Sequence, residues 1–192
     1  MEWRIAETSK GEITFLPQGS SWKYLDDGKD LGTLWKDNDF DDSNWLIGST
    51  PAGFGSILNT PIETTLDYGP QPSNKHPTYY FRTSINIDDP KEFSNFKFNL
   101  HVDDAAIVYI NGNEVIRDGF PENALVTYQT YAPSSGKEGV FDTFEVSSDA
   151  FYSGENLIAV ELHNQSAGSS DLVFDMSVSC LLYTSPSPRD RV

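Results

Sequence analysis

The stretch from Val102 to Arg117 constrains the fold of this chain most, because it consists of two apolar strands joined by a tight turn. β-Branched and aromatic residues lead into Asn111-Gly112, and a second apolar run follows directly. Asn-Gly readily takes the two positive φ angles of a type I′ turn, the usual two-residue connection of a β-hairpin. The flanking residue types suit a pleated, half-buried surface. The segment therefore predicts a β-hairpin.

Period-two alternation between Gly, Pro, Asn and Asp clusters recurs along the chain, whereas apolar spacing typical of helices is nearly absent. Short strands at this spacing are typical of a β-sandwich or jelly roll. We predict an all-β jelly-roll β-sandwich with strands at Tyr79–Ile87, Phe96–Val102, Ala105–Ile110, Glu114–Arg117, Phe141–Val146, Leu157–His163 and Leu172–Val178. Weaker signals lie at Ile13–Leu16 and Trp22–Tyr24.

The stretch from Asp26 to Pro77 carries few strand signals. Irregular segments of that length are uncommon unless they are functional or packed down by their own side chains. We expect four aromatic side chains to hold this stretch against the sandwich, namely Trp35, Phe40, Trp45 and Phe54.

Alternation also assigns faces to two of the strands. Phe96, Phe98, Leu100 and Val102 share one face, and Ile158, Val160 and Leu162 share one face of the later strand. The opposite faces carry Lys97, Asn99 and His101, and Ala159, Glu161 and His163. Each strand is therefore expected to have a core side and a polar, outward side.

Several short motifs together resemble a known fold family. They are Trp22-Lys23-Tyr24, Phe40-Asp41-Asp42-Ser43-Asn44-Trp45, Tyr80-Phe81-Arg82, Asp103-Asp104, Tyr109-Ile110-Asn111-Gly112, Gly154-Glu155-Asn156 and Leu162-His163-Asn164. From Trp22 to Val178 the chain resembles the galactose-binding-domain-like jelly-roll modules of secreted bacterial multidomain proteins. The resemblance implies an accessory module beside a catalytic domain such as a phosphoesterase or glycosidase. It also implies that one structural calcium is a candidate cofactor.

The length of 192 residues predicts one folded domain. We expect residues 1–20 to be a lead-in or first strand and residues 21–179 to be the sandwich. Residues 180–192 are expected to be an artefactual, disordered tail, because Cys180 to Asp190 reads as a translated sequencing adapter in a metagenomic fragment. No apolar run approaches the ~18 residues needed to span a bilayer. With the signal peptide outside this sequence, we expect a secreted or cell-envelope protein.

Charge narrows the range of partners. The formal net charge is −16, with acidic residues scattered over loops and strand edges. Such a chain repels polyanions, so nucleic acid and anionic membranes are poor partners. A neutral polysaccharide or glycan, together with a neighbouring catalytic domain, is the partner set that we expect.

No catalytic set is apparent in the sequence. Asp103 and Asp104 are adjacent on a strand and point to opposite faces, so they cannot act on one substrate as acid and base unless the backbone bulges. Glu161 with His101 and His163 is a ligand set that zinc accepts, but the spacing lacks a compact metal motif. Pairing of Glu161 with Arg82 or a backbone donor is the interpretation that we favour.

A calcium site is a second candidate. Asp37, Asp39 and Asp41 stand at i, i+2 and i+4 of an acidic loop, as at the start of an array of oxygen ligands. The loop is not an EF-hand, because Asp42 occupies the sixth position and Gly48 the twelfth. These three aspartates are the predicted metal ligands.

Carbohydrate recognition needs an aromatic platform surrounded by converging polar groups. The available tyrosines are Tyr68, Tyr79, Tyr80, Tyr128 and Tyr131, and the polar candidates are Arg82, His101, Glu161 and His163. We predict a non-catalytic, carbohydrate-binding accessory module. The alternative is a structural or protein-interaction spacer, and an enzyme ranks last.

Overall fold

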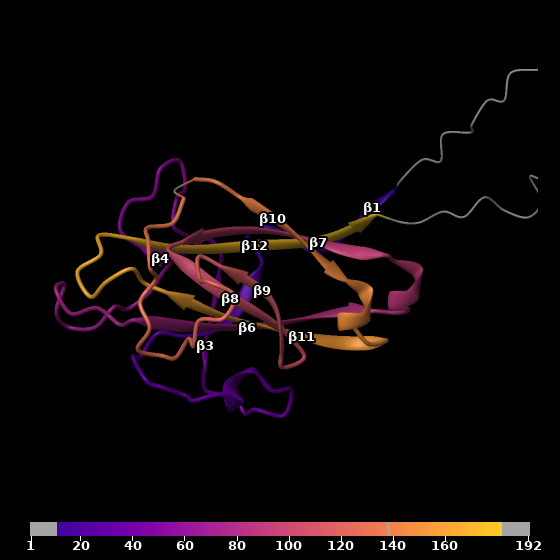
Figure 1. The fold of residues 1–192 in the computed structure, drawn as a ribbon, viewed down its shortest axis with the longest axis horizontal. Helices are drawn as coiled ribbons and strands as arrows, with labels where there is room; N and C mark the ends of the chain where they lie inside the picture. Colours follow the sequence, from indigo (N-terminus) through magenta and orange to yellow (C-terminus); the bar gives the residue numbers. More distant parts are fainter. Residues whose placement is uncertain (1–10, 138, 182–192) are drawn as a thin grey trace, which may run out of the picture.

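The computed structural model describes residues 11–137 and 139–181, which form a sandwich of two six-stranded sheets (Figure 1). All strand pairs are antiparallel except β4 with β5. The all-β prediction is confirmed. Short 3-10 turns at Leu34–Lys36, Pro90–Glu92 and Ser148–Ala150 are the helical elements of the described chain.

The first sheet has the order β10-β7-β12-β4-β5, and β1 pairs with β12. Its strands are β1 (Glu12–Leu16), β4 (Ala52–Phe54), β5 (Thr64–Thr65), β7 (Asn95–Asp103), β10 (Asp142–Ser147) and β12 (Leu172–Leu181). The second sheet has the order β3-β2-β6-β11-β8-β9. Its strands are β2 (Ser21–Leu25), β3 (Leu46–Ser49), β6 (Thr78–Ile87), β8 (Ala105–Ile110), β9 (Asn113–Asp118) and β11 (Gly154–His163).

The predicted hairpin is confirmed between β8 and β9. Ile110 pairs with Asn113, which leaves Asn111 and Gly112 as the two turn residues, with φ angles of 49° and 83°. Both values lie in the left-handed region that a type I′ turn requires. A register shift between Val108 and Tyr109 adds a bulge to the hairpin.

The core lies between the two sheets. The predicted inward residues of β7 (Phe96, Phe98, Leu100 and Val102) and of β11 (Ile158, Val160 and Leu162) are all buried there. Aromatic rings join the layers, since Trp22 and Phe81 of the second sheet contact Phe174 of the first at centroid distances of 5.1 and 4.7 Å. Such offset and edge contacts add to the stabilisation from area burial.

The outer face of the second sheet is covered rather than polar and open. A second apolar cluster joins Tyr80, Ile107, Tyr109 and Ala159 of the sheet to Trp35 and Tyr128 of two loops. Phe40 and Trp45 pack against this cluster, as expected of anchors, whereas Phe54 lies in the main core. The expectation of a polar outward face is therefore wrong for this sheet, because the loops over 26–45 and 119–132 bury it.

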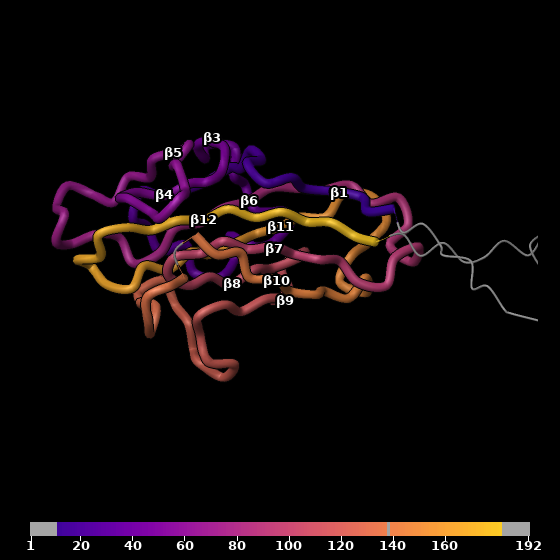
Figure 2. The backbone as a smooth tube through the Cα atoms, turned by 90° about the horizontal axis from the view of Figure 1, so that it is seen from above, coloured from indigo at the N-terminus to yellow at the C-terminus, as the bar shows by residue number. Residues whose placement is uncertain are grey.

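The long stretch of 26–77 also contains β3, β4 and β5, which the sequence did not indicate. β4 and β5 extend the first sheet beside β12, and β3 forms an edge of the second sheet beside β2. In Figure 2 the connection after β9 projects beyond the body of the elongated sandwich. Among the described residues no helix is long and apolar enough to cross a membrane.

The last strand is longer than predicted. β12 continues through Cys180 and Leu181, so these two residues belong to the sandwich and not to a disordered tail. Cys180 is buried at 2% exposure and pairs with Phe96 on one side and Ile13 on the other. At Cys180, β12 is therefore a strand held between β1 and β7. The rest of the predicted tail, 182–192, lies outside the described residues, as do residues 1–10 of the predicted lead-in.

Candidate functional site

Arg82 holds a loop against the outer face of the second sheet. The Arg82 side chain is 4% exposed, and its Nε donates to Asp42 Oδ2 at 2.7 Å. Its Nη1 donates to the carbonyl oxygens of Trp35 and Asp37. The guanidinium therefore ties both ends of the segment 35–42 to β6, which fixes the loop that borders two hollows in this face.

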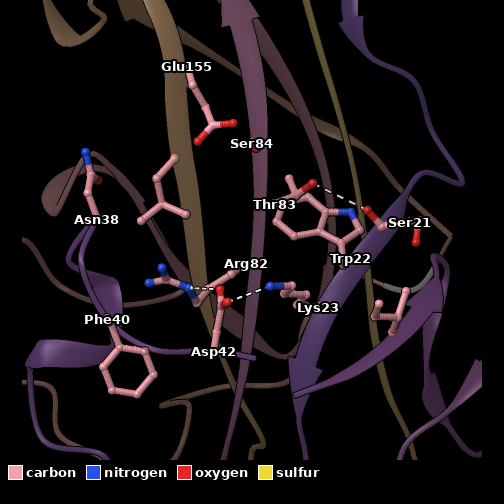
Figure 3. A pocket seen from close by; sticks show the side chains of 12 residues that line it. Ser21, Trp22, Lys23, Asn38, Phe40, Asp42, Arg82, Thr83, Ser84 and Glu155 are labelled. Carbon is pink, nitrogen blue, oxygen red and sulfur yellow. Dashed lines mark hydrogen bonds and ion pairs between the residues drawn. The ribbon is translucent and has the colours of Figure 1, made fainter. Parts of the chain in front are cut away.

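Asp42 is the ionic centre of this arrangement. Besides the contact to Arg82, its Oδ1 accepts a hydrogen bond from Lys23 Nζ at 2.6 Å (Figure 3). Burial acts to raise the pKa of Asp42, but the hydrogen bonds from Lys23 and Arg82 outweigh burial and hold this pKa below its usual value. Asp42 is therefore a carboxylate at neutral pH.

The first hollow is a groove of about 490 Å³, drawn in Figure 3, which we call the Arg82 groove. Its lining is mainly polar and includes Lys23, Asp42, Arg82, Asn38, Ser84 and Glu155. Phe40 is the aromatic ring in this lining that lies on the sheet's outer side. The groove therefore offers hydrogen-bonding groups but little aromatic surface.

The second hollow has about 380 Å³ and lies over β8, β9 and β11; we call it the Tyr109 pocket. The loop residues Trp35, Lys36, Leu125 and Tyr128 form its sides, and Tyr109, Glu114, Arg117 and Glu161 come from the strands. Its aromatic rings, Trp35, Tyr109 and Tyr128, are 2%, 6% and 7% exposed, so the pocket offers a limited aromatic surface on which charged groups converge.

The floor of the Tyr109 pocket is a hydrogen-bonded chain. Tyr109 donates from its hydroxyl to Glu161 Oε1 at 2.6 Å, and Glu161 Oε2 lies 3.4 Å from Nε2 of His163. His163 Nδ1 lies within hydrogen-bond distance of Thr78 Oγ1 and the Thr130 carbonyl, at 3.0 and 2.8 Å. Burial, with Glu161 close by, raises the pKa of Tyr109, so its hydroxyl stays a donor.

The sides of the pocket are held by ring and charge contacts. Lys36 Nζ lies 4.0 Å from the Tyr109 ring centroid, and the Trp35 ring meets Tyr109 edge-on at 5.8 Å. Arg117 donates to both carboxylate oxygens of Glu114, at 2.7 and 2.8 Å. This bidentate geometry fixes the direction of the guanidinium beside the pocket.

The five predicted tyrosines do not form one exposed platform. Tyr79 and Tyr80 are 0% and 2% exposed, on the inner and outer faces of β6, and Tyr128 is 7% exposed with its hydroxyl donating to the Gly28 carbonyl at 2.6 Å. None of these three rings can lie flat under a sugar, because other side chains cover them. Burial raises the pKa of Tyr128 to about 12. Tyr68 and Tyr131 are half-buried.

The cluster of Glu161, His101 and His163 that zinc could accept does not form. Glu161 and His163 share a face of β11, but His101 lies in β7 of the other sheet. The two histidines therefore lie in different sheets. Alternation along the sequence shows which face of a strand a residue is on, but not which sheet the strand belongs to. Arg82 pairs with Asp42 and not with Glu161, which is instead bound by Tyr109.

Asp103 and Asp104 lie at the β7–β8 junction, and Asp104 binds backbone groups of two loops. Both are buried, and Asp104 accepts hydrogen bonds from the backbone N–H groups of Gly136 and Gln165, at 3.2 and 2.6 Å. Burial raises the pKa of Asp104. Asp104 therefore joins two loops to the end of the sandwich.

The three aspartates predicted to bind calcium lie in the loop that Arg82 holds. The Asp37 carbonyl accepts from Arg82 and from the Phe40 N–H, and Asp41 Oδ1 accepts from the Ser43 N–H at 3.0 Å. Across 11–137 and 139–181, no group of three or more His, Cys, Asp or Glu side chains is placed to hold a metal ion. Calcium at Asp37, Asp39 and Asp41 stays a prediction.

The site residues predicted from the sequence include Tyr128 and Glu161 of the Tyr109 pocket but not its other aromatic and charged residues, Asp30, Trp35, Lys36, Tyr109, Glu114 and Arg117. Tyr109 was recognisable as an outward residue, since it alternates with Val108 and Ile110 of the core. Trp35 was expected as an anchor, but its position beside β8 depends on how the loop crosses the sheet.

Solved structures of several glycosidases resemble this chain. A beta-glucuronidase 2 of Bacteroides uniformis matches with a TM-score of 0.55 and 17% identity, over 90% of this chain and 18% of that chain. A glycosyl hydrolase family 2 member from Bacteroides cellulosilyticus matches with a TM-score of 0.52 and 17% identity, over 88% and 20%. A beta-glucuronidase of an uncultured Clostridium species matches with a TM-score of 0.53 and 12% identity, over 95% and 31%.

At these identities the likeness shows a shared fold. The chain spans less than a third of the length of each of these three proteins. No family model matches the sequence, and comparison with the curated proteins gives no match. The β-sandwich fold expected from the sequence is thus found within larger glycosidase chains.

Proposed function

We propose that this domain is a non-catalytic accessory module of a larger glycosidase chain and that it binds glycan in the Tyr109 pocket. The observation that carries the proposal is the composition of that pocket, in which aromatic rings and hydrogen-bonding side chains meet in about 380 Å³. The fold supports it, because the similar structures are much longer glycosidase chains. We propose also that such a module acts outside the cytoplasm.

The contacts of the buried carboxylates support a binding role. Glu161 is engaged by Tyr109 and faces His163, and Asp104 accepts two backbone N–H groups. A catalytic acid and base of a glycosidase must flank one bond at a defined separation. Glu161 lies within β11 and Asp104 lies near the end of that strand, where it accepts the Gln165 N–H, and each of the two carboxylates already serves the structure.

A glycan array, followed by pull-down on insoluble polysaccharides, tests the proposal with the full chain. We expect retention on at least one glycan, lost in Arg117→Ala and retained in Tyr152→Ala, a control at an exposed tyrosine that does not line the pocket. Binding to no glycan would contradict the proposal. Hydrolysis of a glycan that disappears in Glu161→Gln would show that the domain is an enzyme.

The second candidate is a docking module, and an exposed apolar patch on the first sheet favours it. Leu58, Val140 and Phe141 are 60%, 46% and 38% exposed, and Gly139, which precedes the latter two, lies close to the backbone of Leu58. The Phe141 ring lies 5.0 Å from His101 of β7, which places the patch on that sheet's outer side. Exposed apolar groups of this kind mark contact surfaces. Its test is whether Phe141→Ser weakens binding of a separately expressed catalytic domain.

A further inference from the structure

Lys36 occupies the ring face that a ligand of the Tyr109 pocket would use. Its Nζ lies 4.0 Å from the centroid of the Tyr109 ring, well inside the ~6 Å reach of a cation–π contact. Within the part of the chain that the structure describes, Lys36 forms no ion pair. The ring is therefore the main partner of this ammonium group.

The remaining charges of the pocket favour a cation at this position. Arg117 and Glu114 neutralise each other through two hydrogen bonds, at 2.7 and 2.8 Å. The carboxylates of Asp30, Glu114 and Glu161 line the pocket together with the cations Lys36 and Arg117, and Arg117 also interacts electrostatically with Glu161. If the Lys36 side chain moved away, the pocket would carry an excess of negative charge, and the net charge of −16 would add to its attraction for cations.

The Lys36 side chain can move away from the Tyr109 ring. It is half-buried and stands at the end of the 3-10 turn Leu34–Lys36, while the backbone of this segment is held by Arg82 through Trp35 and Asp37. The lysine side chain is a flexible four-carbon stem with a compact, strongly hydrated charge. It can therefore swing into solvent while the rigid walls of the pocket stay in place.

We propose that the Tyr109 pocket binds a glycan that carries a free amino group, whose ammonium replaces that of Lys36 over the Tyr109 ring. This inference rests on the proposed function and narrows its ligand to amino sugars. In the bound state the ligand ammonium contacts the ring and faces the carboxylate of Glu161. Lys36 then acts as an internal competitor for the site.

Isothermal titration of the full chain with three oligosaccharides of equal length tests this assignment: glucosamine oligomers, N-acetylglucosamine oligomers and glucose oligomers. We expect the glucosamine oligomers to bind more than about tenfold tighter than either uncharged set. Lys36→Met should raise the affinity for glucosamine oligomers by about threefold, because it removes the competing cation–π contact. Lys97→Met, an exposed lysine on β7 of the other sheet, is the matched control and should change nothing.

Tyr109→Leu should abolish binding, and its melting curve shows whether the domain still folds. If Tyr109→Leu does not fold, Lys36→Met still tests the inference, because the half-exposed Lys36 side chain contributes little to folding. Equal affinity for all three oligosaccharides, sensitive to Tyr109→Leu, would overturn the amino-sugar inference and leave the glycan-binding proposal standing. Binding to none of them and to no glycan on the array would overturn both. Tighter binding of a lysine-rich peptide than of glucosamine oligomers would assign the site to a protein partner and overturn the inference.

Discussion

Asn111 donates from its side-chain Nδ2 to Oδ1 of Asn156 at 2.8 Å, so the turn of the β8–β9 hairpin is fastened to the start of β11. Asn111 Oδ1 also accepts the backbone N–H of Leu157 at 3.0 Å. Asn156 is fully buried and donates to the carbonyls of Tyr152 and Gly154. A turn residue thus helps to set the register of the strand that carries Glu161.

Replacing the turn asparagine should destabilise the domain. Asn111→Ala loses both side-chain hydrogen bonds and strains a residue at a φ of 49°, so we expect a loss of about 1–3 kcal/mol in the free energy of unfolding. Asn111→Gly keeps the φ angle without strain and should lose less. Urea unfolding measures both, with the exposed Asn113→Ala as a control within about 0.5 kcal/mol of the wild type. Equal stability of all three variants would contradict this role.

The glycine of the same turn should resist substitution. Gly112 has a φ of 83°, and a Cβ there would lie 3.2 Å from Asp37 Oδ1. A β-branched residue is strained at positive φ, so Gly112→Val should cost more than about 1 kcal/mol. Asn113→Thr in the neighbouring strand should be nearly neutral. If denaturant melts show that both substitutions are harmless, the turn type is wrong.

The Arg82 contacts should be the main support of the loop that borders both hollows. Arg82→Met removes the buried partner of Asp42, which keeps Lys23, and removes the donor to the Trp35 and Asp37 carbonyls, so we expect a loss of about 1–3 kcal/mol. We expect faster proteolysis within residues 26–45 and a matching loss in urea unfolding. The exposed pair of Lys29 and Asp27 supplies the control, since Lys29→Met should cost less than about 0.5 kcal/mol. Proteolysis at the wild-type rate in Arg82→Met would show that the loop is held by its aromatic rings alone.

Strand prediction succeeded where alternation runs over five or more residues. β6, β7, β11 and β12 each show it, and the hairpin adds the turn residues Asn111 and Gly112. β4 and β5 have three and two residues, too few for a period of two to be recognised. Their strand geometry comes from pairing with β12 and with each other, which is a tertiary effect.

The site could be predicted only in part for a similar reason. Glu161 and Tyr109 were assignable to outward faces, but their contact requires that β8 lie beside β11, and strand order is not encoded in alternation. Trp35 and Lys36 reach the pocket because Arg82 of β6 holds their backbone. Burial of Tyr80 and Tyr128 follows from the same loop placement, so the tyrosines expected on the surface were the least predictable residues.

The end of β12 should contribute to stability. A chain that ends at Leu181 keeps Cys180, which is buried between β1 and β7, whereas a chain that ends at Ser179 loses it. We expect the shorter chain to melt several degrees lower, since about 1 kcal/mol corresponds to 2–4 °C for a domain of this size. Differential scanning calorimetry of the two chains decides the matter. Equal melting temperatures would mean that the native sandwich ends before Cys180.

His101 should make the domain less stable in mild acid. Burial lowers the pKa of His101 below its usual 6.5, against the opposing influence of Asp175, and its Nε2 accepts the Gly139 N–H at 3.1 Å. The folded state therefore favours the neutral ring, while the unfolded chain takes up a proton near pH 6.5. The resulting stabilisation is complete above that pH and is lost as the pH falls below it.

His101→Gln isolates this contribution, because the amide can still accept from Gly139 and does not titrate. We expect the free energy of unfolding of the wild type to fall relative to that of His101→Gln between pH 6.5 and pH 5, by at most about 1.4 kcal/mol per pH unit for one proton. Urea unfolding at intervals over pH 5–8 measures both proteins. Buried carboxylates such as Asp104, whose pKa is raised, make the folded state more stable as the pH falls. Subtracting the unfolding free energy of the variant from that of the wild type removes this opposite effect. Parallel curves over this range would show that protonation of His101 does not oppose folding.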